Sequence, residues 1–193
     1  AELPNAFQPA PPPPLQPGLA EGDHAAAVAT ILAAIAAGET YQVNFTFPMH
    51  ARFNGDPEAL FRLLAGQSAA PHAAYLECGG WALVSLSPEL FFRRAGDRVE
   101  MRPMKGTRLR GRFPEEDAAQ AAGLAASAKE RAENLMIVDM VRNDLGRIAE
   151  AGSVHVARLF ELERYPTVWQ MTSTVTARTA AGLPQLFRAL FPC

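Results

Sequence analysis

The stretch AAYLECGGWALVSLS (73–87) decides the fold class, because it predicts two β-strands joined by a tight turn. Gly79 and Gly80 separate two runs of β-prone residues, and such a two-glycine connection is a typical hairpin signal. The next stretch, ELFFRRAGDRVEMRPM (89–104), repeats the pattern around a turn at residues 95–97. Two consecutive hairpins predict antiparallel β-sheet.

Helices are predicted on both sides of these hairpins. Residues 23–37 form the first, with Asp23 as its cap and Gly38 as its end, and residues 56–66 form a second that ends at Gly66. The order lacks the regular alternation of strand and helix that produces parallel sheets, so we expect an α+β fold in which antiparallel β-sheets are flanked by helices. Further strands and a last helix are expected at residues 41–47, 153–162, 167–177 and 183–190.

The composition is that of an ordinary globular protein. The chain has 193 residues, of which 49% are hydrophobic and 20% are charged, and its net charge is −2. This balance gives no overall attraction to nucleic acid or to an anionic membrane, and the longest apolar run (25–37) is too short to span a bilayer. Two cysteines without CxxC spacing fit a reducing cytoplasm. We therefore expect a cytoplasmic protein with neither nucleic acid nor membrane as a partner.

The first 20 residues differ in composition from the rest. They contain PAPPPPLQP (9–17), which is too rich in proline for helix or sheet and predicts a linker or arm. Residues 21–193 are expected to form one domain. Because the chain stops directly after a helix-like segment, we expect this domain to be truncated at its C-terminus.

Lys105 lies where a predicted strand ends, in RPMKGT (102–107). Most lysines are ordinary surface charges. Five basic residues occur between Arg102 and Arg112, and such a patch suits either a small anionic ligand or a solvated strand edge. Gly106 and Thr107 favour the first reading, because a glycine lets a ligand approach the backbone and exposed N–H groups can hold a carboxylate. A glycine after a strand is also common in a plain turn.

Glu89 is the acid that the second hairpin brings to Lys105. If the turn centres on Asp97, the numbers of facing residues sum to 194, which places Glu89 opposite Lys105 (89 + 105 = 194). A two-residue turn would instead shift the pairing by one and place the two on opposite faces. A facing acid and amine form either a surface ion pair worth ~0–1 kcal/mol or a proton donor beside a nucleophile.

Glu133 lies on a long predicted helix that begins with a capping box formed by Ser127 and Glu130 and runs to about Gly146. The run LMIVDMV (135–141) is apolar nearly all round, which indicates a buried helix. A carboxylate on such a helix needs a basic partner or a hard cation bound through oxygen. The residues alone leave both readings open.

Four motifs in this order together resemble the chorismate-utilising enzymes, which include anthranilate synthase, aminodeoxychorismate synthase and isochorismate synthase chains. They are GETYQVNF (38–45), SPELFF (87–92), RPMKGT (102–107) and SAKERAENLMIVDMVRNDLGRI (127–148). The resemblance covers residues 20–193 and implies the fold of anthranilate synthase component I, here incomplete. Residues 21–193 are then a chorismate-binding domain.

Two positions resemble the aminodeoxychorismate synthase branch of the family. That branch carries lysine where other members have alanine, and this chain has Lys105; isochorismate and salicylate synthases carry a water-activating lysine where this chain has Gln42. The implied activity converts chorismate and ammonia to 4-amino-4-deoxychorismate in para-aminobenzoate and folate biosynthesis, through a covalent lysine intermediate. Anthranilate synthase component I and a non-catalytic chorismate-binding module remain the alternatives.

The resemblance also implies roles for the candidate residues. Lys105 attacks the chorismate ring, Glu89 protonates the departing hydroxyl, Gly106 and Thr107 lie against a substrate carboxylate, and Glu133 holds Mg²⁺. Ammonia comes from a separate glutamine amidotransferase subunit. The chain departs from the family at Gln170, where histidine is common, and it does not contain the glycine-rich segment and the second metal-binding glutamate that the family carries further on.

Overall fold

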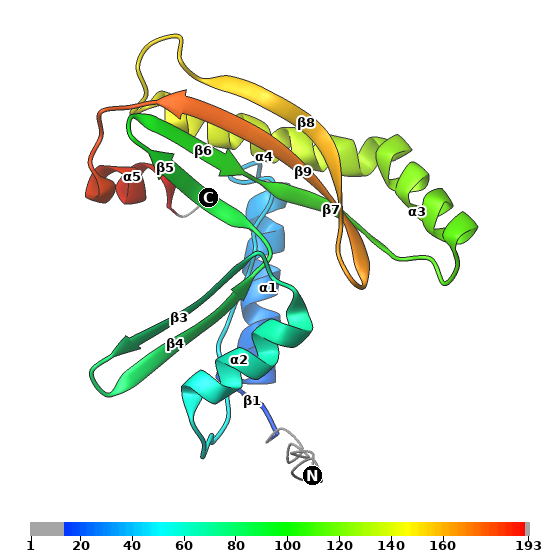
Figure 1. Ribbon diagram of the computed structural model, residues 1–193, viewed down its shortest axis with the longest axis vertical. Coiled ribbons are helices and arrows are strands. Elements are labelled where there is room, and N and C mark those ends of the chain that lie inside the picture. The colour runs from blue at the N-terminus through cyan, green and yellow to red at the C-terminus, as the bar shows by residue number, and fades with distance from the viewer. Residues whose placement is uncertain (1–13, 192–193) are drawn as a thin grey trace, which may run out of the picture. The chain divides into compact units, whose positions relative to one another are not determined.

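The computed structural model describes residues 14–191, which divide into two compact units between Gly55 and Asp56 (Figure 1). The predicted proline-rich arm lies mostly outside the described residues, so its boundary at residue 20 stays a prediction. Within the part of the chain that is described, no helix is both long enough and apolar enough to cross a membrane.

Helix α1 (Glu21–Ala36) confirms the first predicted helix, although it begins two residues early. Ala20 occupies the cap position without a side-chain hydrogen bond, so the prediction that Asp23 caps this helix is wrong. Asp23 instead lies in the first turn, where its charge still interacts favourably with the helix dipole. Gly38 ends the helix as predicted, because its φ of 75° suits a glycine after the last turn.

The prediction of a strand at 41–47 is wrong. The segment has no strand partner among residues 14–191, and its alternating apolar side chains are exposed: Tyr41, Val43, Phe45 and Phe47. Alternation favours an extended backbone, but a strand also needs a neighbour to pair with its N–H and C=O groups. Among residues 14–55 only β1 (Gln16–Pro17) and β2 (Met49–His50) pair, so the end of the proline-rich stretch takes part in a short ladder.

The second unit starts with a helix and the two-glycine hairpin. Helix α2 (Pro57–Ser68) is capped by Asp56, whose carboxylate accepts a hydrogen bond from the Glu58 N–H at 3.0 Å, and it runs two residues past Gly66. Strands β3 (His72–Cys78) and β4 (Trp81–Ser87) pair antiparallel directly across Gly79–Gly80, which confirms the predicted hairpin.

A five-stranded antiparallel sheet forms the centre of this unit. Strand β9 (Val168–Arg178) pairs along one edge with β6 (Arg98–Arg102) and β7 (Met104–Leu109), and along the other edge with β8 (His155–Arg164). Strand β5 (Leu90–Ala95) extends the sheet beyond β6 (Figure 1). The fold class is therefore α+β with antiparallel sheets, as predicted.

Three helices accompany this sheet: α3 (Pro114–Ala126), α4 (Ala128–Gly146) and α5 (Leu183–Leu190). Helices α4 and α5 confirm the predicted helices, whereas the polar, alanine-rich segment that forms α3 was not predicted to be a helix. Helix α4 lies along one face of the sheet and packs on β7, β8 and β9 (Figure 1). The core between α4, α5 and the strands includes Val99, Val138, Val141, Leu145, Val175, Leu186 and Leu190.

Candidate active site

Lys105 and Gly106 form a β-bulge in β7. Met104 pairs with Thr172 and Thr107 pairs with Gln170, so these two residues together oppose only one residue of β9. Gly106 has φ of 106°, a conformation that residues with a Cβ rarely adopt. A bulge turns side chains away from the regular alternation of its strand. The direction of the Lys105 side chain therefore depends on this local irregularity.

The predicted pairing of Glu89 with Lys105 across the second hairpin is wrong. Ala95 pairs with Arg98, so the turn has two residues rather than three, and the ladder shifts once more further along. The two-residue turn is the alternative that the sequence left open, and the ladder ends at the pair of Leu90 with Arg102, so Lys105 lies outside it.

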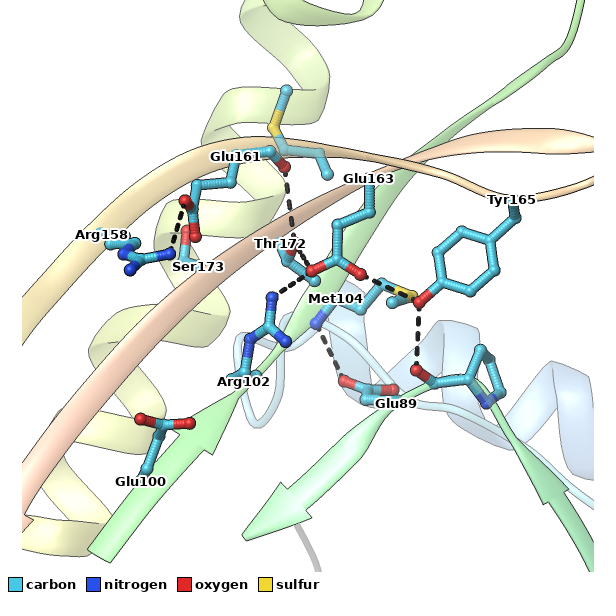
Figure 2. Close-up of polar contacts among 12 residues, drawn as sticks. Glu89, Glu100, Arg102, Met104, Arg158, Glu161, Glu163, Tyr165, Thr172 and Ser173 are labelled. Atoms are coloured by element: carbon cyan, nitrogen blue, oxygen red, sulfur yellow. Dashed lines mark hydrogen bonds and ion pairs between the residues drawn. The ribbon is translucent and has the colours of Figure 1, made fainter. Parts of the chain in front are cut away.

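Glu89 nevertheless lies near the charge of Lys105. Glu89 directly precedes β5, and its Oε1 accepts a hydrogen bond from the Met104 N–H at 2.9 Å (Figure 2). Burial raises the pKa of Glu89 although part of the residue stays exposed, while the Met104 N–H and the positive charge of Lys105 act in the opposite direction. A carboxyl whose pKa is raised keeps its proton to higher pH and can donate it.

Gly106 and Thr107 lie beside β9. The Thr107 hydroxyl donates a hydrogen bond to Gln170 Oε1 at 2.8 Å, and Thr107 itself is exposed. A Cβ at Gly106 would lie only 3.1 Å from Met171 Cβ, so the glycine brings the β7 backbone close to β9. Gln170 is thereby a neighbour of the two residues predicted to bind substrate.

Glu133 occupies the surface side of α4, which corrects the expectation that it is buried. Its side chain is 43% exposed and lies 3.7 Å from Lys129 Nζ. The buried stripe of α4 begins one residue further along, at Asn134, and continues with Val138, Val141 and Leu145. Exposed pairs of this kind contribute ~0–1 kcal/mol, so the Lys129 contact leaves Glu133 available to a ligand.

Glu130 was missed because the capping-box pattern already explained it. Ser127 does cap α4, with its hydroxyl accepting from the Glu130 N–H at 3.4 Å, but the Ser127 N–H donates to Leu124 O instead of to the Glu130 carboxylate. The carboxylate instead lies beside the bulge, with Oε2 3.4 Å from where a Cβ of Gly106 would be. Its spacing of three residues from Glu133 puts both acids on one side of the helix and could have identified it.

Glu130 and Glu133 in the first turns of α4 are oxygen ligands of the kind that a hard cation prefers. Mg²⁺ is usually held by one or two carboxylates and completes its shell with water and substrate oxygens. Among residues 14–191 no group of three or more His, Cys, Asp or Glu side chains could hold a metal by itself. Any cation held by Glu130 and Glu133 would need water or substrate oxygens to complete its shell.

A polar network centred on Glu163 lies next to Glu89 (Figure 2). The Glu163 carboxylate pairs with Arg102 and accepts hydrogen bonds from the Thr172 hydroxyl at 2.8 Å and the Tyr165 hydroxyl at 2.9 Å. Burial, followed by the nearby Glu163, raises the pKa of Tyr165 to about 12, so this phenol stays neutral. Sequence patterns did not single out this network, because its members come from three strands and from the loop between β8 and β9.

A cavity of about 470 Å³ borders this network. None of the five predicted site residues lines it, although Pro88 and Leu90 on either side of Glu89 do. Lys105, Gly106 and Thr107 therefore lie where β6 passes into β7, beside the cavity and outside its lining. The cavity lining is Ala69, Pro71, His72, Pro88, Leu90, Arg93, Arg102, Met104, Glu163, Arg164, Tyr165, Pro166 and Thr172.

Comparison with known proteins gives a consistent family. Residues 2–193 match the family model of chorismate binding enzymes. The chain is 54% identical over 162 residues to an aminodeoxychorismate synthase of Streptomyces griseus, covering 82% of this chain and 22% of that protein. It is 48% identical over 165 residues to aminodeoxychorismate synthase component 1 of Klebsiella aerogenes, covering 84% and 36%. The chain thus spans only about a fifth to a third of the length of these relatives.

Anthranilate synthases are also similar. Identity to component 1 of Aquifex aeolicus is 39% over 160 residues, covering 82% of this chain and 32% of that protein. The crystal structure of anthranilate synthase component I from Streptococcus pneumoniae matches the whole chain with a TM-score of 0.83 at 27% identity, over 43% of its own length. The predicted fold is confirmed by this match.

Proposed function

The chain belongs to the chorismate binding enzymes, and we propose that the protein uses this fold to convert chorismate and ammonia to 4-amino-4-deoxychorismate. One observation carries the proposal: Lys105 lies on a β-bulge directly after Met104, whose N–H donates a hydrogen bond to the carboxyl of Glu89. Identity is also higher to the aminodeoxychorismate synthases of Streptomyces griseus and Klebsiella aerogenes, at 54% and 48%, than to anthranilate synthase component 1 of Aquifex aeolicus, at 39%.

The reaction needs a nucleophile and a proton donor. The neutral amine of Lys105 forms a bond to ring carbon C2, the ring double bonds shift, and the C4–O bond breaks while Glu89 gives its proton to the hydroxyl, which leaves as water. Ammonia then forms a bond to C4, the bond between C2 and Lys105 breaks, and the surplus proton returns to Glu89. Chorismate and ammonia are thus consumed, and aminodeoxychorismate and water are produced.

The substrate carboxylates would lie against the bulge and the first turns of α4. The backbone at Gly106 is suited to hydrogen-bond a carboxylate, and the hydroxyl of Thr107 would do so in place of its hydrogen bond to Gln170 Oε1. Glu133, with Glu130 one turn before it, would hold Mg²⁺, which when bound neutralises substrate charge as a Lewis acid.

The ammonia would come from a glutamine amidotransferase partner. Support comes from relatives that are named component 1, a name that belongs to one part of a larger enzyme. The alternative, anthranilate synthase, is disfavoured by Lys105. Product analysis that separates anthranilate from aminodeoxychorismate distinguishes the two activities.

The decisive test is replacement of Lys105 in the full-length protein. Lys105→Ala and Lys105→Arg should each lower aminodeoxychorismate formation on the order of 10³-fold or more, because the arginine keeps the charge but is no nucleophile. Wild-type protein incubated with chorismate and without ammonia should carry a chorismate-derived adduct on Lys105, detected by peptide mass spectrometry.

Lys129→Arg is the matched control, because it removes the other lysine of this chain and keeps the charge beside Glu133. This variant should retain activity and the adduct. Undiminished product formation by Lys105→Ala would show that the nucleophile assignment is incorrect.

A further inference from the structure

Strand β9 faces one bulge along each of its two edges, one in β7 and one in β8. On β7, Lys105 and Gly106 oppose Met171. On β8, Arg158 pairs with Thr174 and Glu161 pairs with Thr172, so the two residues 159–160 oppose Ser173 in the same way. The two bulges therefore lie two residues apart on opposite edges of β9.

The second bulge includes a strained residue. Phe160 has φ of 59°, in the left-handed region that a bulky side chain rarely adopts. Such a conformation costs of order 1–3 kcal/mol and persists only where surrounding contacts enforce it. The Phe160 N–H donates to the Ser173 hydroxyl oxygen at 3.1 Å, which is one such contact.

Asn134 of α4 ties both bulges together. Its Nδ2 donates hydrogen bonds to Lys105 O at 3.1 Å and to Met171 O at 3.0 Å, which uses both of its N–H groups. Its Oδ1 accepts from the Ser173 hydroxyl at 2.5 Å, and Ser173 in turn holds the N–H of Phe160. A bulge interrupts the ladder, so backbone groups there need such partners.

The burial of Asn134 shows that this arrangement is specific. Asn134 is 1% exposed, and the other three buried residues of α4 (Val138, Val141 and Leu145) are all apolar. An apolar residue at 134 would remove the side-chain donor from both of these carbonyl oxygens, and a buried polar group that is left unmet costs about 1–3 kcal/mol. General packing of α4 on the sheet explains the valines and the leucine, whereas an amide is needed only at the bulge.

We infer that Asn134 is a positioning residue for Lys105. By holding the carbonyl group of Lys105 in the bulge and that of Met171 opposite it, Asn134 sets the direction in which the Lys105 side chain leaves the sheet. This inference rests on the proposed role of Lys105 as nucleophile. Because Glu133 is the next residue before Asn134, the same hydrogen bonds also fix the bulge relative to the helix that carries the proposed metal ligand.

The test compares three variants of the full-length protein with a matched control. Asn134→Leu removes both N–H donors and keeps the number of side-chain heavy atoms. Asn134→Asp replaces the donors with a carboxylate oxygen, which only accepts. Ser173→Ala keeps Asn134 but removes the hydroxyl that donates to its Oδ1. Thr179→Val is the control, because Thr179 is also fully buried and its hydroxyl also donates to a backbone carbonyl, that of Ile148 at 2.5 Å.

The first measurement is the rate at which chorismate forms its adduct on Lys105 without ammonia. Misplacement of a reacting group by about 1 Å can cost on the order of 100-fold, so we expect a loss of that size in both Asn134 variants and a smaller loss in Ser173→Ala. In steady-state assays kcat should fall while KM for chorismate changes little. Thr179→Val should keep the wild-type rates even if its melting temperature falls by as much as that of the Asn134 variants.

The second measurement does not depend on the reaction. Lys105 and Lys129 are the only lysines of the 193 residues, so competitive acylation followed by peptide mass spectrometry gives the reactivity of Lys105 relative to Lys129. The pH profile of this ratio should change in Asn134→Leu and stay unchanged in Thr179→Val.

The outcomes separate the inference from the proposed function. A wild-type protein that is active but forms no adduct contradicts the covalent mechanism, and the acylation profile then still decides whether Asn134 positions Lys105. If Asn134→Leu forms the adduct at the wild-type rate with a wild-type acylation profile, the inference is wrong. Should that variant fail to fold, wild-type behaviour of Ser173→Ala in both measurements overturns it equally.

Discussion

At the scale of single residues, Glu89 shows how opposing influences set a protonation state. Burial raises the pKa of Glu89 and is the largest influence, whereas the Met104 N–H and the charge of Lys105 favour the ionised form. The net effect is a carboxyl that stays protonated above its ordinary pKa of 4.5. That direction suits a proton donor, because a carboxyl with a lowered pKa would have lost its proton before reaching a working pH.

We predict that the activity of the full-length protein falls with rising pH as Glu89 loses its proton. The sign follows from the raised pKa: the protonated donor is present below that pKa and is lost above it. Glu89→Gln should have low activity, and this part of the pH–rate profile should disappear.

Glu100→Gln is a suitable control for that experiment. Glu100 is a partly buried carboxylate on β6 that pairs with Arg93 at 3.9 Å and has no proposed role in the reaction. This variant should keep the wild-type pH profile. An unchanged profile in Glu89→Gln would exclude Glu89 as the titrating group.

At the scale of elements, the bulge in β7 decides where the candidate residues lie. Without the bulge, the side chains of β7 would alternate regularly between the two faces of the sheet, and the position of Lys105 in the strand would alone set its face. Gly106 is the residue that permits the bulge, because its φ of 106° combines with close neighbours on both sides: Met171 Cβ at 3.1 Å and Glu130 Cβ at 3.3 Å from a hypothetical Cβ.

Gly106→Ala should therefore destabilise the protein by about 1–3 kcal/mol, the usual cost of holding a non-glycine residue in such a conformation. Urea unfolding monitored by circular dichroism measures this change. Gly66→Ala in α2 is the control with the opposite sign: nothing lies within 4 Å of its added Cβ, and alanine in a helix is about 0.5–1 kcal/mol more stable than glycine. Equal effects of the two substitutions would argue against a strained bulge.

At the scale of the whole molecule, the larger unit depends on a core shared by segments far apart in the sequence. Val99 of β6, Leu145 of α4, Val175 of β9 and Leu186 of α5 are all fully buried in one cluster. The sheet that carries the bulge and the helix that carries Glu133 and Asn134 are therefore held together by the same apolar contacts.

We expect Leu186→Ala to lower the free energy of unfolding by about 2–5 kcal/mol, the range for removing a buried leucine. Leu183→Ala in the same helix is the matched control, because Leu183 is 53% exposed and its loss should change stability by less than about 0.5 kcal/mol. Chemical denaturation of the full-length variants measures both. Similar effects for the two would mean that α5 does not contribute its buried face to this core.

The sequence alone determined the features that rest on local signals. The two-glycine hairpin of β3 and β4, the start of α4 at Ser127 and the end of α1 at Gly38 were all predicted correctly. Turn residues and helix caps act on backbone groups within a few positions along the chain, so the information that sets them lies next to them. The motif around Lys105 likewise indicated the family, because its residues are contiguous in the chain.

Only the tertiary structure decided the features that depend on distant partners. The two-residue turn before β6, the absence of a partner for residues 41–47 within the described part of the chain, and the orientation of Glu130 toward Gly106 all differ from the predictions. The hydrogen bonds of Asn134 were not predicted at all, because they reach carbonyl groups 29 and 37 residues away in the chain. The physical reason is that register, bulges and buried hydrogen bonds are set by which backbone groups remain unpaired after strands from separate parts of the chain have met.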